Sequence, residues 1–371
     1  MSLPAIGSTD PERINTISSS RFHRLVTRCR RAETNLSFSA FGITEIYSRS
    51  ASFGASCNCG AMTTLITGGT GFIGAEIARM LVGQGEDVHV AHRSGNLGRL
   101  EGIADQVQLH QFDLSVPGSA SALLAKVAPE RLFHFGAILT APGEEDPQAL
   151  LQANAAGFIE TIEAARTAGT RQMIFASSIG TYGRDTGGGT INDMTLQRPH
   201  SVYGVSKVLG ENLGAYYRHK YGLDFRGLRY PSIVGPGVTT WSVAQYTSWI
   251  IEKPALGEPF EVWVPPEAVV AILHYQDAAR AAIELSEAPL ESIESINYLV
   301  DGIQPTPNAG ELADVVRARI PGAEIAFAPP EGAAAGSVRI DDSAARQEWG
   351  WEPAFDTEGM VDAVIAEARG N

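Results

Sequence analysis

The sequence predicts an α/β fold: a doubly wound parallel sheet of the Rossmann type, followed by a small C-terminal substrate-binding lobe. Short apolar runs of strand character alternate with amphipathic stretches of helical length from residue 62 to about residue 236. A glycine-rich turn follows the first run, and beyond residue 236 Pro and Gly become frequent and the rhythm is less regular. Alternating strands and helices build a parallel sheet covered on both faces, and such sheets bind ligands at the carboxyl ends of their strands.

The individual elements follow from periodicity and length. Short runs rich in apolar residues predict strands at 64–67, 88–92, 107–112, 132–136, 173–178 and 225–232. Longer amphipathic stretches, such as 149–168 and 201–220, predict helices. We therefore expect a Rossmann domain at 62–235 and, at 236–371, a lobe with segments that return to the main sheet.

The composition excludes several classes of partner. The 371 residues carry a formal net charge of −14, and an acidic chain repels phosphate backbones, so nucleic acid is not an expected partner. No apolar run reaches the roughly 18 residues that a membrane-spanning helix needs. All three cysteines lie within residues 1–61, and the Cys57–Cys59 spacing fits neither a zinc knuckle nor a redox pair, so no metal site is predicted.

Residues 1–61 differ in composition from the rest of the chain. They contain seven Arg, no Lys and only four acids, with many Ser, which is typical of an organelle transit peptide. The alternative is translated upstream sequence with the natural start at Met62, in which case the protein is expected in the cytoplasm. In both cases we expect this extension to be poorly ordered and to hold no catalytic residue.

The glycine-rich turn has the form of a phosphate-binding loop. Gly68, Gly71 and Gly74 stand three residues apart between the first strand and a helix. The first permits a tight turn, the second a close approach of the backbone to a pyrophosphate, and the third close packing of helix on strand. The amides at the helix start, around Thr70, Phe72 and Ile73, then face the anion. We therefore predict a bound dinucleotide, NAD or NADP.

The end of the second strand selects between these two cofactors. NAD enzymes usually place an acid there for the adenosine ribose, whereas this chain has His92 and Arg93. An Arg at this position can pair with a 2′-phosphate, which favours NADP; the alternative is that Arg93 stacks on adenine or points to solvent. Asp113 and Leu114 follow the third strand, where an adenine contact is expected.

A Tyr and a Lys on one helix face form the predicted reaction centre. Tyr203 and Lys207 stand at i and i+4, and an ammonium close to a phenol is expected to lower its pKa from about 10. Tyr203 would then act as general acid or base for a carbonyl or an alcohol. Ser178, at the end of a strand, is the preferred hydrogen-bond donor to substrate, with Ser177 as the alternative and a turn cap as the structural reading.

Asn154 lies inside a predicted helix, where Asn is unfavourable. It fits either a cap at a kink near the site or a residue with no special role.

Together these motifs resemble the extended short-chain dehydrogenase/reductase superfamily, and several stretches are similar to its L-threonine 3-dehydrogenases. These stretches are 134–141, 177–183, 203–207, 228–231 and 341–351. The resemblance implies cofactor contacts from Gly136, Ala137, Tyr203, Lys207 and Tyr230, and substrate contacts from Thr140, Ser178, Tyr203, Thr239 and Thr240. This chain departs from the pattern at Trp241, where an acid is usual, at Gly336-Ser337, where Trp-Pro is usual, and at Arg93.

The resemblance leaves two enzymatic functions open. The first is a dehydrogenase or reductase of a small hydroxy or keto compound; the second is a nucleotide-sugar epimerase or dehydratase with the same Ser, Tyr and Lys. A nucleotide-sugar needs cations for its phosphates, yet residues 231–300 contain only Lys253 and Arg280, beside several aromatic residues. This favours the dehydrogenase, unless Arg317, Arg319 or Arg339 folds back. A non-enzymatic sensor is disfavoured because both Tyr203 and Lys207 are present.

Helices 149–168 and 201–220 are the pair that related enzymes use to form a homodimer, which we also expect.

Overall fold

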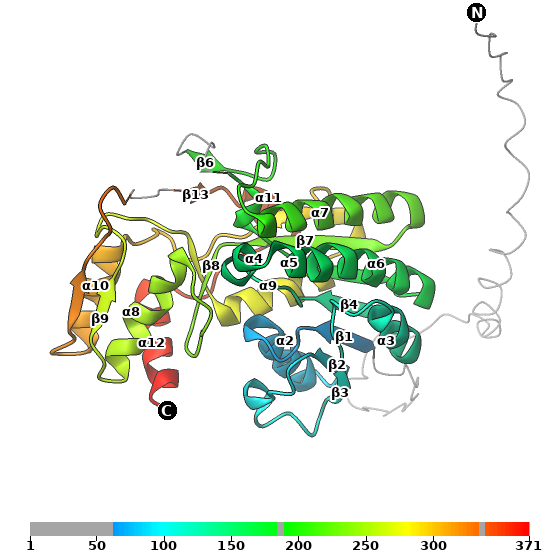
Figure 1. Ribbon diagram of the computed structural model, residues 1–371, viewed down its shortest axis with the longest axis horizontal. Coiled ribbons are helices and arrows are strands. Elements are labelled where there is room, and N and C mark those ends of the chain that lie inside the picture. Colours follow the sequence, from blue (N-terminus) through cyan, green and yellow to red (C-terminus); the bar gives the residue numbers. More distant parts are fainter. Residues whose placement is uncertain (1–61, 184–188, 334–337, 371) are drawn as a thin grey trace, which may run out of the picture. The chain divides into compact units, whose positions relative to one another are not determined.

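A seven-stranded parallel sheet organises the fold (Figure 1). The computed structural model describes residues 62–183, 189–333 and 338–370. In the sheet the strand order is β11-β7-β5-β4-β1-β2-β3, and every neighbouring pair is parallel. Strand order reverses between β1 and β4, which is where such sheets bind ligands. The strands are β1 Thr63–Thr67, β2 Asp87–His92, β3 Gln108–Gln111, β4 Arg131–His134, β5 Gln172–Ser178, β7 Asp224–Tyr230 and β11 Asn297–Leu299. The predicted fold class is confirmed.

Helices cover both faces of this sheet. On one face pack α2 (Phe72–Gly83) and α9 (Tyr275–Glu287), and on the other α3 (Ser119–Val127), α6 (Gly157–Ala168) and α7 (Val202–Tyr221). Successive strand residues point to opposite faces, so strands buried on both sides are apolar at consecutive positions. The first face buries Ile66, Phe133, Ile174 and Leu228; the second buries their neighbours or near neighbours Leu65, Leu132, Met173 and Phe225.

Two predicted elements are divided in the structure. Strand 225–232 ends as β7, and a separate β8 (Ser232–Val234) pairs with β10 (Ile272–His274). The break falls at Pro231, which has no N–H to donate to a ladder. Helix 149–168 consists of α5 (Pro147–Leu150), a π-helical stretch (Leu151–Ala156) and α6.

Asn154 lies in this π-helical stretch and bonds across to the loop after β4. Its Oδ1 accepts from the Ile138 N–H at 2.8 Å, and its Nδ2 donates to the Ile138 carbonyl at 2.8 Å and to Ser206 Oγ at 3.4 Å. The side chain thus satisfies both backbone groups of Ile138 and reaches α7. The structure supports the interpretation that this Asn holds an irregularity of the helix near the site.

The C-terminal lobe has a core of its own. Helices α8 (Tyr246–Ala255), α10 (Ala309–Arg319) and α12 (Thr357–Ala368) enclose it together with the paired strands β9 (Phe260–Val262) and β12 (Ile325–Phe327). β11 pairs with β7 at the edge of the main sheet. The boundary at residue 235 stays a prediction. The remaining elements are α4 (Thr140–Glu145), α11 (Ser343–Trp349) and the pair β6 (Thr190–Ile191) and β13 (Arg339–Ile340).

The alternatives for residues 1–61, and the departure at Gly336-Ser337, fall outside the described residues. Within the described ranges, none of the helices combines the length and the apolar character that crossing a membrane requires.

Candidate active site

The phosphate loop joins β1 to α2 at the point where the strand order reverses. Gly68 has φ +68°, and a Cβ built on it would lie 2.7 Å from the backbone nitrogen of Gly136. A Cβ on Gly74 would lie 2.4 Å from the carbonyl oxygen of Gly68. Only glycine fits either position, for the tight turn and the close packing that the spacing predicts.

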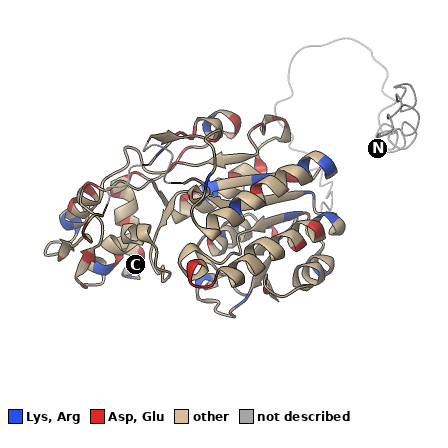
Figure 2. Cartoon of the chain, turned by 45° about the horizontal axis from the view of Figure 1, so that its top comes forward, with Lys and Arg blue, Asp and Glu red and all other residues tan. Residues whose placement is uncertain are grey.

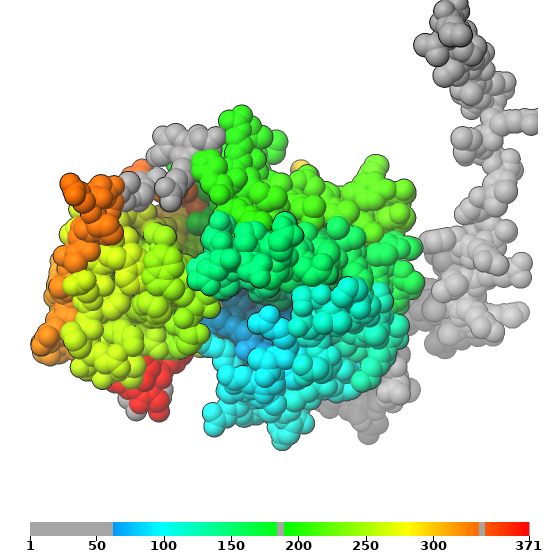
Figure 3. All heavy atoms as spheres, viewed as in Figure 1, coloured from blue at the N-terminus to red at the C-terminus, as the bar shows by residue number. Residues whose placement is uncertain are grey.

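The start of α2 is open to an anion. It has no side-chain cap and no acid in its first turn, so its first amides are not paired with a side chain. Figure 3 shows this region, in blue, at the bottom of a hollow beside the lobe. The Phe72 ring lies between Tyr275, with ring centroids 5.1 Å apart, and the Arg99 guanidinium, 4.7 Å away. The Phe72 side chain is thus engaged with these two residues, which leaves its backbone amide for a ligand of the loop. A dinucleotide pyrophosphate fits this cradle.

The turns after β2 and β3 lie beside this loop in the sheet. His92 Nδ1 accepts from the Gly95 N–H at 3.2 Å, and Gln111 donates to the Arg93 carbonyl at 2.8 Å. These bonds fix the backbone and leave the Arg93 side chain exposed. Asp113 Oδ1 accepts from the Ser115 N–H and hydroxyl at 2.9 and 2.7 Å. Partial burial acts to raise the pKa of Asp113, but these bonds and the charge of Arg93 outweigh it and hold the pKa below its usual value.

The three predicted reaction-centre residues come together where β5 meets the start of α7. Ser201 caps α7 through its Oγ, which accepts from the Gly204 N–H at 3.0 Å. Lys207 Nζ donates to the Ala176 carbonyl of β5 at 2.6 Å and lies 5.4 Å from the centroid of the Tyr203 ring. Ser178 Oγ accepts from the Gly180 N–H at 3.0 Å and shares a hydrogen bond with the Tyr203 side chain. The site thus combines a phenol, a hydroxyl and a buried cation.

The expectation that Lys207 lowers the pKa of Tyr203 is wrong for this structure. Burial raises the pKa of Tyr203 to about 12, against the opposing hydrogen bond with Ser178. Burial also lowers the pKa of Lys207 to about 8, against the opposing charge of Glu211. Burial is thus the largest influence on both pKa values, and the Lys207 ammonium donates to a backbone carbonyl of β5.

The other predicted contacts are distributed around this centre. Gly136 abuts Gly68, and a Cβ on Gly136 would lie 3.1 Å from Leu114 Cδ1, so the ends of β1, β3 and β4 meet there. Ala137 follows Gly136 and is half-buried. Thr140 is exposed at the start of α4, while Thr239 is exposed and Thr240 half-buried in the loop after β8.

Tyr230 stands at the carboxyl end of β7. It pairs with Ser178 across the β5–β7 ladder, but its hydroxyl donates to the Ala278 carbonyl of α9 at 2.8 Å. The side chain is buried in the core of that face. Its hydroxyl is therefore committed to α9, and a cofactor contact from this residue stays a prediction.

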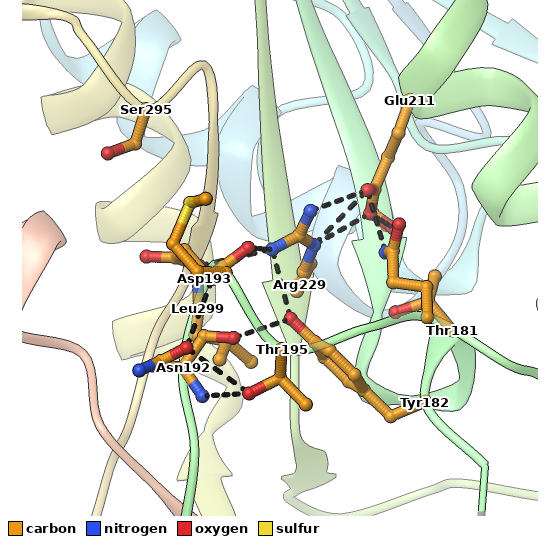
Figure 4. Close-up of polar contacts among 12 residues, drawn as sticks. Thr181, Tyr182, Asn192, Asp193, Thr195, Glu211, Arg229, Ser295 and Leu299 are labelled. Atoms are coloured by element: carbon orange, nitrogen blue, oxygen red, sulfur yellow. Dashed lines mark hydrogen bonds and ion pairs between the residues drawn. The ribbon is translucent and has the colours of Figure 1, made fainter.

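Ser177 is also distinguished from Ser178. Its Oγ donates to Glu211 Oε1 at 2.5 Å within the buried side of the sheet. Glu211 in turn pairs with Arg229, which contacts Tyr182 and Asp193 (Figure 4). Sequence reasoning missed this buried network. The signal that could have found it is the position of Glu211, four residues after Lys207 and hence on the same face of α7.

The fold and this site define a dinucleotide-binding Rossmann protein with a short-chain dehydrogenase type of Ser, Tyr and Lys cluster. The chain belongs to the NAD dependent epimerase/dehydratase family, whose model matches residues 64–300. The family resemblance inferred from the sequence is thus confirmed.

Relatives within this family include dehydrogenases. The mitochondrial L-threonine 3-dehydrogenase of Bos taurus is 34% identical over 244 residues, which are 63% of this chain and 63% of that protein. The match therefore spans less than two thirds of that relative. Among solved structures, a GalE-like L-threonine dehydrogenase from Cupriavidus necator has a TM-score of 0.74 at 26% identity, covering 82% of this chain and 99% of that one. A UDP-glucose 4-epimerase from Thermotoga maritima also has a TM-score of 0.74, at 22% identity over 83% and 99% of the chains. The fold alone does not separate the two activities.

Proposed function

We propose that this protein is an NAD(P)-dependent oxidoreductase that moves a hydride between the nicotinamide and a secondary alcohol or ketone. The substrate would be small, either L-threonine-like or another hydroxy or keto compound. The observation that carries this proposal is the joint position of Ser178, Tyr203 and Lys207 at the carboxyl end of β5. This edge of the sheet also carries the glycine cradle.

Each residue has a distinct role in the proposed reaction. The bound cofactor supplies or accepts the hydride. Tyr203 exchanges the proton of the substrate oxygen, and Ser178 hydrogen-bonds that oxygen. Lys207, held by the Ala176 carbonyl, provides a positive charge beside the phenol and would also hold the nicotinamide ribose. With a pKa of about 12, Tyr203 is protonated at neutral pH, which is the form that donates a proton to a ketone.

The charges of the lobe favour a small substrate over a nucleotide-sugar. Phosphates need unpaired cations, and basic and acidic positions are interspersed over the lobe (Figure 2). Of the three arginines that could have folded back towards a substrate, Arg317 and Arg319 pair with carboxylates, whereas Arg339 is exposed on β13 and forms no ion pair within the described ranges. The pairs are Lys253–Glu258 at 2.8 Å, Arg280–Asp277 at 2.8 Å, Arg317–Asp314 at 2.8 Å and Arg319–Glu358 at 2.6 Å.

Aromatic side chains gather in the same lobe. The Trp263 ring contacts four others, with centroid separations of 5.7 to 6.4 Å, and Trp241 beside the Thr239-Thr240 pair is 52% exposed. The four are Trp241, Tyr246, Trp249 and Phe260. An apolar surface next to a predicted substrate loop supports a hydrophobic or aromatic hydroxy or keto substrate.

The proposed cofactor preference is NADP. Its support is Arg93, whose exposed guanidinium makes no hydrogen bond with the described parts of the chain and is free to pair with a 2′-phosphate. The family itself is described as NAD dependent, so NAD is the alternative.

The proposed assembly is a homodimer formed through α6 and α7. These helices expose Ile159, Val205, Leu209 and Tyr216, an apolar face that a second copy could cover. Light scattering at micromolar protein should then give the mass of a dimer, and a monomer peak would contradict it.

We propose the cytoplasm as the location, with an organelle as the alternative.

The first test is cofactor reduction with NAD and with NADP against a panel of alcohols. The panel holds L-threonine, 2- and 3-hydroxy acids, aromatic secondary alcohols and nucleotide-sugars. Turnover of a non-nucleotide alcohol supports the oxidoreductase. If no alcohol leads to reduction of NAD or NADP, and the protein interconverts nucleotide-sugars while its cofactor stays tightly bound, the epimerase is supported instead.

A further inference from the structure

Arg229 lies at the centre of the buried network that Figure 4 shows. It stands on β7 opposite Ser177 of β5, one position before the pair formed by Tyr230 and Ser178. Only 6% of its surface is exposed. One side of the guanidinium, Nε and Nη2, donates to the Glu211 carboxylate at 2.8 to 3.2 Å. The other side, Nη1, donates to Tyr182 Oη at 3.0 Å and to Asp193 Oδ1 at 3.2 Å.

Glu211 connects this guanidinium to the reaction centre. Its carboxylate accepts from Ser177 Oγ at 2.5 Å and from Gln197 Nε2 at 2.9 Å. Tyr203, Lys207 and Glu211 follow one another at intervals of four residues, so they share one face of α7. The charge of Glu211 also acts on Lys207, raising its pKa against the effect of burial. Any shift of this carboxylate therefore reaches both the end of β5 and the catalytic cation.

Asp193 holds the opposite side of Arg229. Its Oδ1 also accepts from the Leu299 N–H of β11 at 2.6 Å, whereas its buried Oδ2 has no hydrogen-bond partner among the described residues. Burial raises the pKa of this carboxyl to about 6, and the charged groups that face it are Arg229, Glu211 and Glu348. Two buried carboxylates thus share one guanidinium.

We propose that Arg229 is a positioning residue for the reaction centre: by bridging Glu211 and Asp193 it holds the end of β5, and hence Ser178, against the face of α7 that carries Tyr203 and Lys207. This inference rests on the proposed function. The guanidinium bonds Glu211 through Nε and Nη2 and Asp193 through Nη1, a spread that the single nitrogen of a Lys ammonium does not have. Without the bridge, Glu211 is a buried carboxylate with less compensation, and its charge still acts on Lys207.

The test compares Arg229→Lys with Arg226→Lys. Arg226 is a matched control because it is a buried arginine of the same strand that bonds Asp224 and the carbonyls of Leu285 and Ala288. Through Asp224 it reaches α7 only at Arg218, in the last turn of the helix and far along it from Tyr203. We expect both variants to lose thermal stability. Only Arg229→Lys should lower kcat, on the order of tenfold or more, with the KM for cofactor unchanged, because a displacement of about 1 Å in a catalytic group costs up to about a hundredfold.

Asp193→Asn provides a second variant that removes the charge but keeps an oxygen for the Leu299 N–H. In the wild type, ketone reduction should slow as the pH falls through about 6, where Asp193 gains a proton and its bond with Arg229 is no longer an ion pair. Asp193→Asn should show the lower rate at every pH and lack this transition.

The inference is overturned if Arg229→Lys or Asp193→Asn keeps the wild-type kcat and pH profile, or if Arg226→Lys loses kcat to the same extent. Tyr203→Phe is measured in parallel. If Tyr203→Phe retains turnover, the proposed reaction centre fails. If it is inactive while Arg229→Lys is unaffected, only the positioning role fails.

Discussion

Replacing Gly74 by alanine tests the phosphate cradle directly. The added methyl would lie 2.4 Å from the Gly68 carbonyl oxygen and 2.9 Å from the Gly69 Cα, and both neighbours are backbone atoms that cannot rotate away. Ordinary contact begins near 3.4 Å, so the loop and the start of α2 must separate by about 1 Å. Overpacking of this kind costs about 1–3 kcal/mol, and dinucleotide affinity should fall by about tenfold or more because the amides no longer converge on the pyrophosphate.

Gly83→Ala is the matched control for this change. Gly83 is the last residue of the same helix, and a Cβ there meets no atom within 4 Å. Alanine in a helix is more stable than glycine by about 0.5–1 kcal/mol, so this variant should bind cofactor normally and melt slightly higher. Both variants are measured by titration calorimetry with NADH and NADPH and by thermal melting. Wild-type affinity and melting temperature in Gly74→Ala would refute the cradle geometry.

Three further outcomes are expected. Tyr203→Phe should bind cofactor normally but lose turnover by about two orders of magnitude or more, and stopped-flow binding with steady-state rates checks this. Alcohol oxidation by the wild type should accelerate as the pH rises towards about 8, because the phenolate is the required base and the pKa of Tyr203 is about 12. Above that pH Lys207 loses its charge and the gain should level off, and a rate that falls on the approach to pH 8 would contradict this sign. Arg93→Ala should lower kcat/KM for NADP far more than for NAD, since only the 2′-phosphate loses a partner; equal losses would assign Arg93 to the adenine instead.

The parts of the site that could be predicted are those that depend on residues close together in the sequence. The glycine spacing and the Tyr203–Lys207 interval each lie within one turn or one helix, so the order of residues determines the geometry. The parallel sheet likewise followed from alternating apolar runs. The break at Pro231 was accessible in principle, because a residue without an N–H interrupts a strand ladder.

The features that sequence reasoning missed depend on contacts between distant segments. In the sequence, nothing distinguishes Arg229 from other strand residues. Its role depends on the fold, which places it between Glu211 of α7 and Asp193. The raised pKa of Tyr203 depends on the extent of desolvation around the phenol, which spacing does not contain. Tyr230 was assigned to the cofactor by family pattern, whereas the position of α9 determines where its hydroxyl bonds.

The bonds of Asn154 have a consequence for how new specificities could arise. Its amide joins Ile138, two residues before Thr140, to Ser206 on the helix of Tyr203 and Lys207. The loop that leads to Thr140 is therefore bonded to the helix that carries the proposed proton donor. If Thr140 contacts substrate as predicted, exchanging its side chain would change the preferred substrate while these bonds keep the loop attached to α7. Substitutions at this loop could therefore change substrate specificity in evolution while the proposed reaction centre is kept.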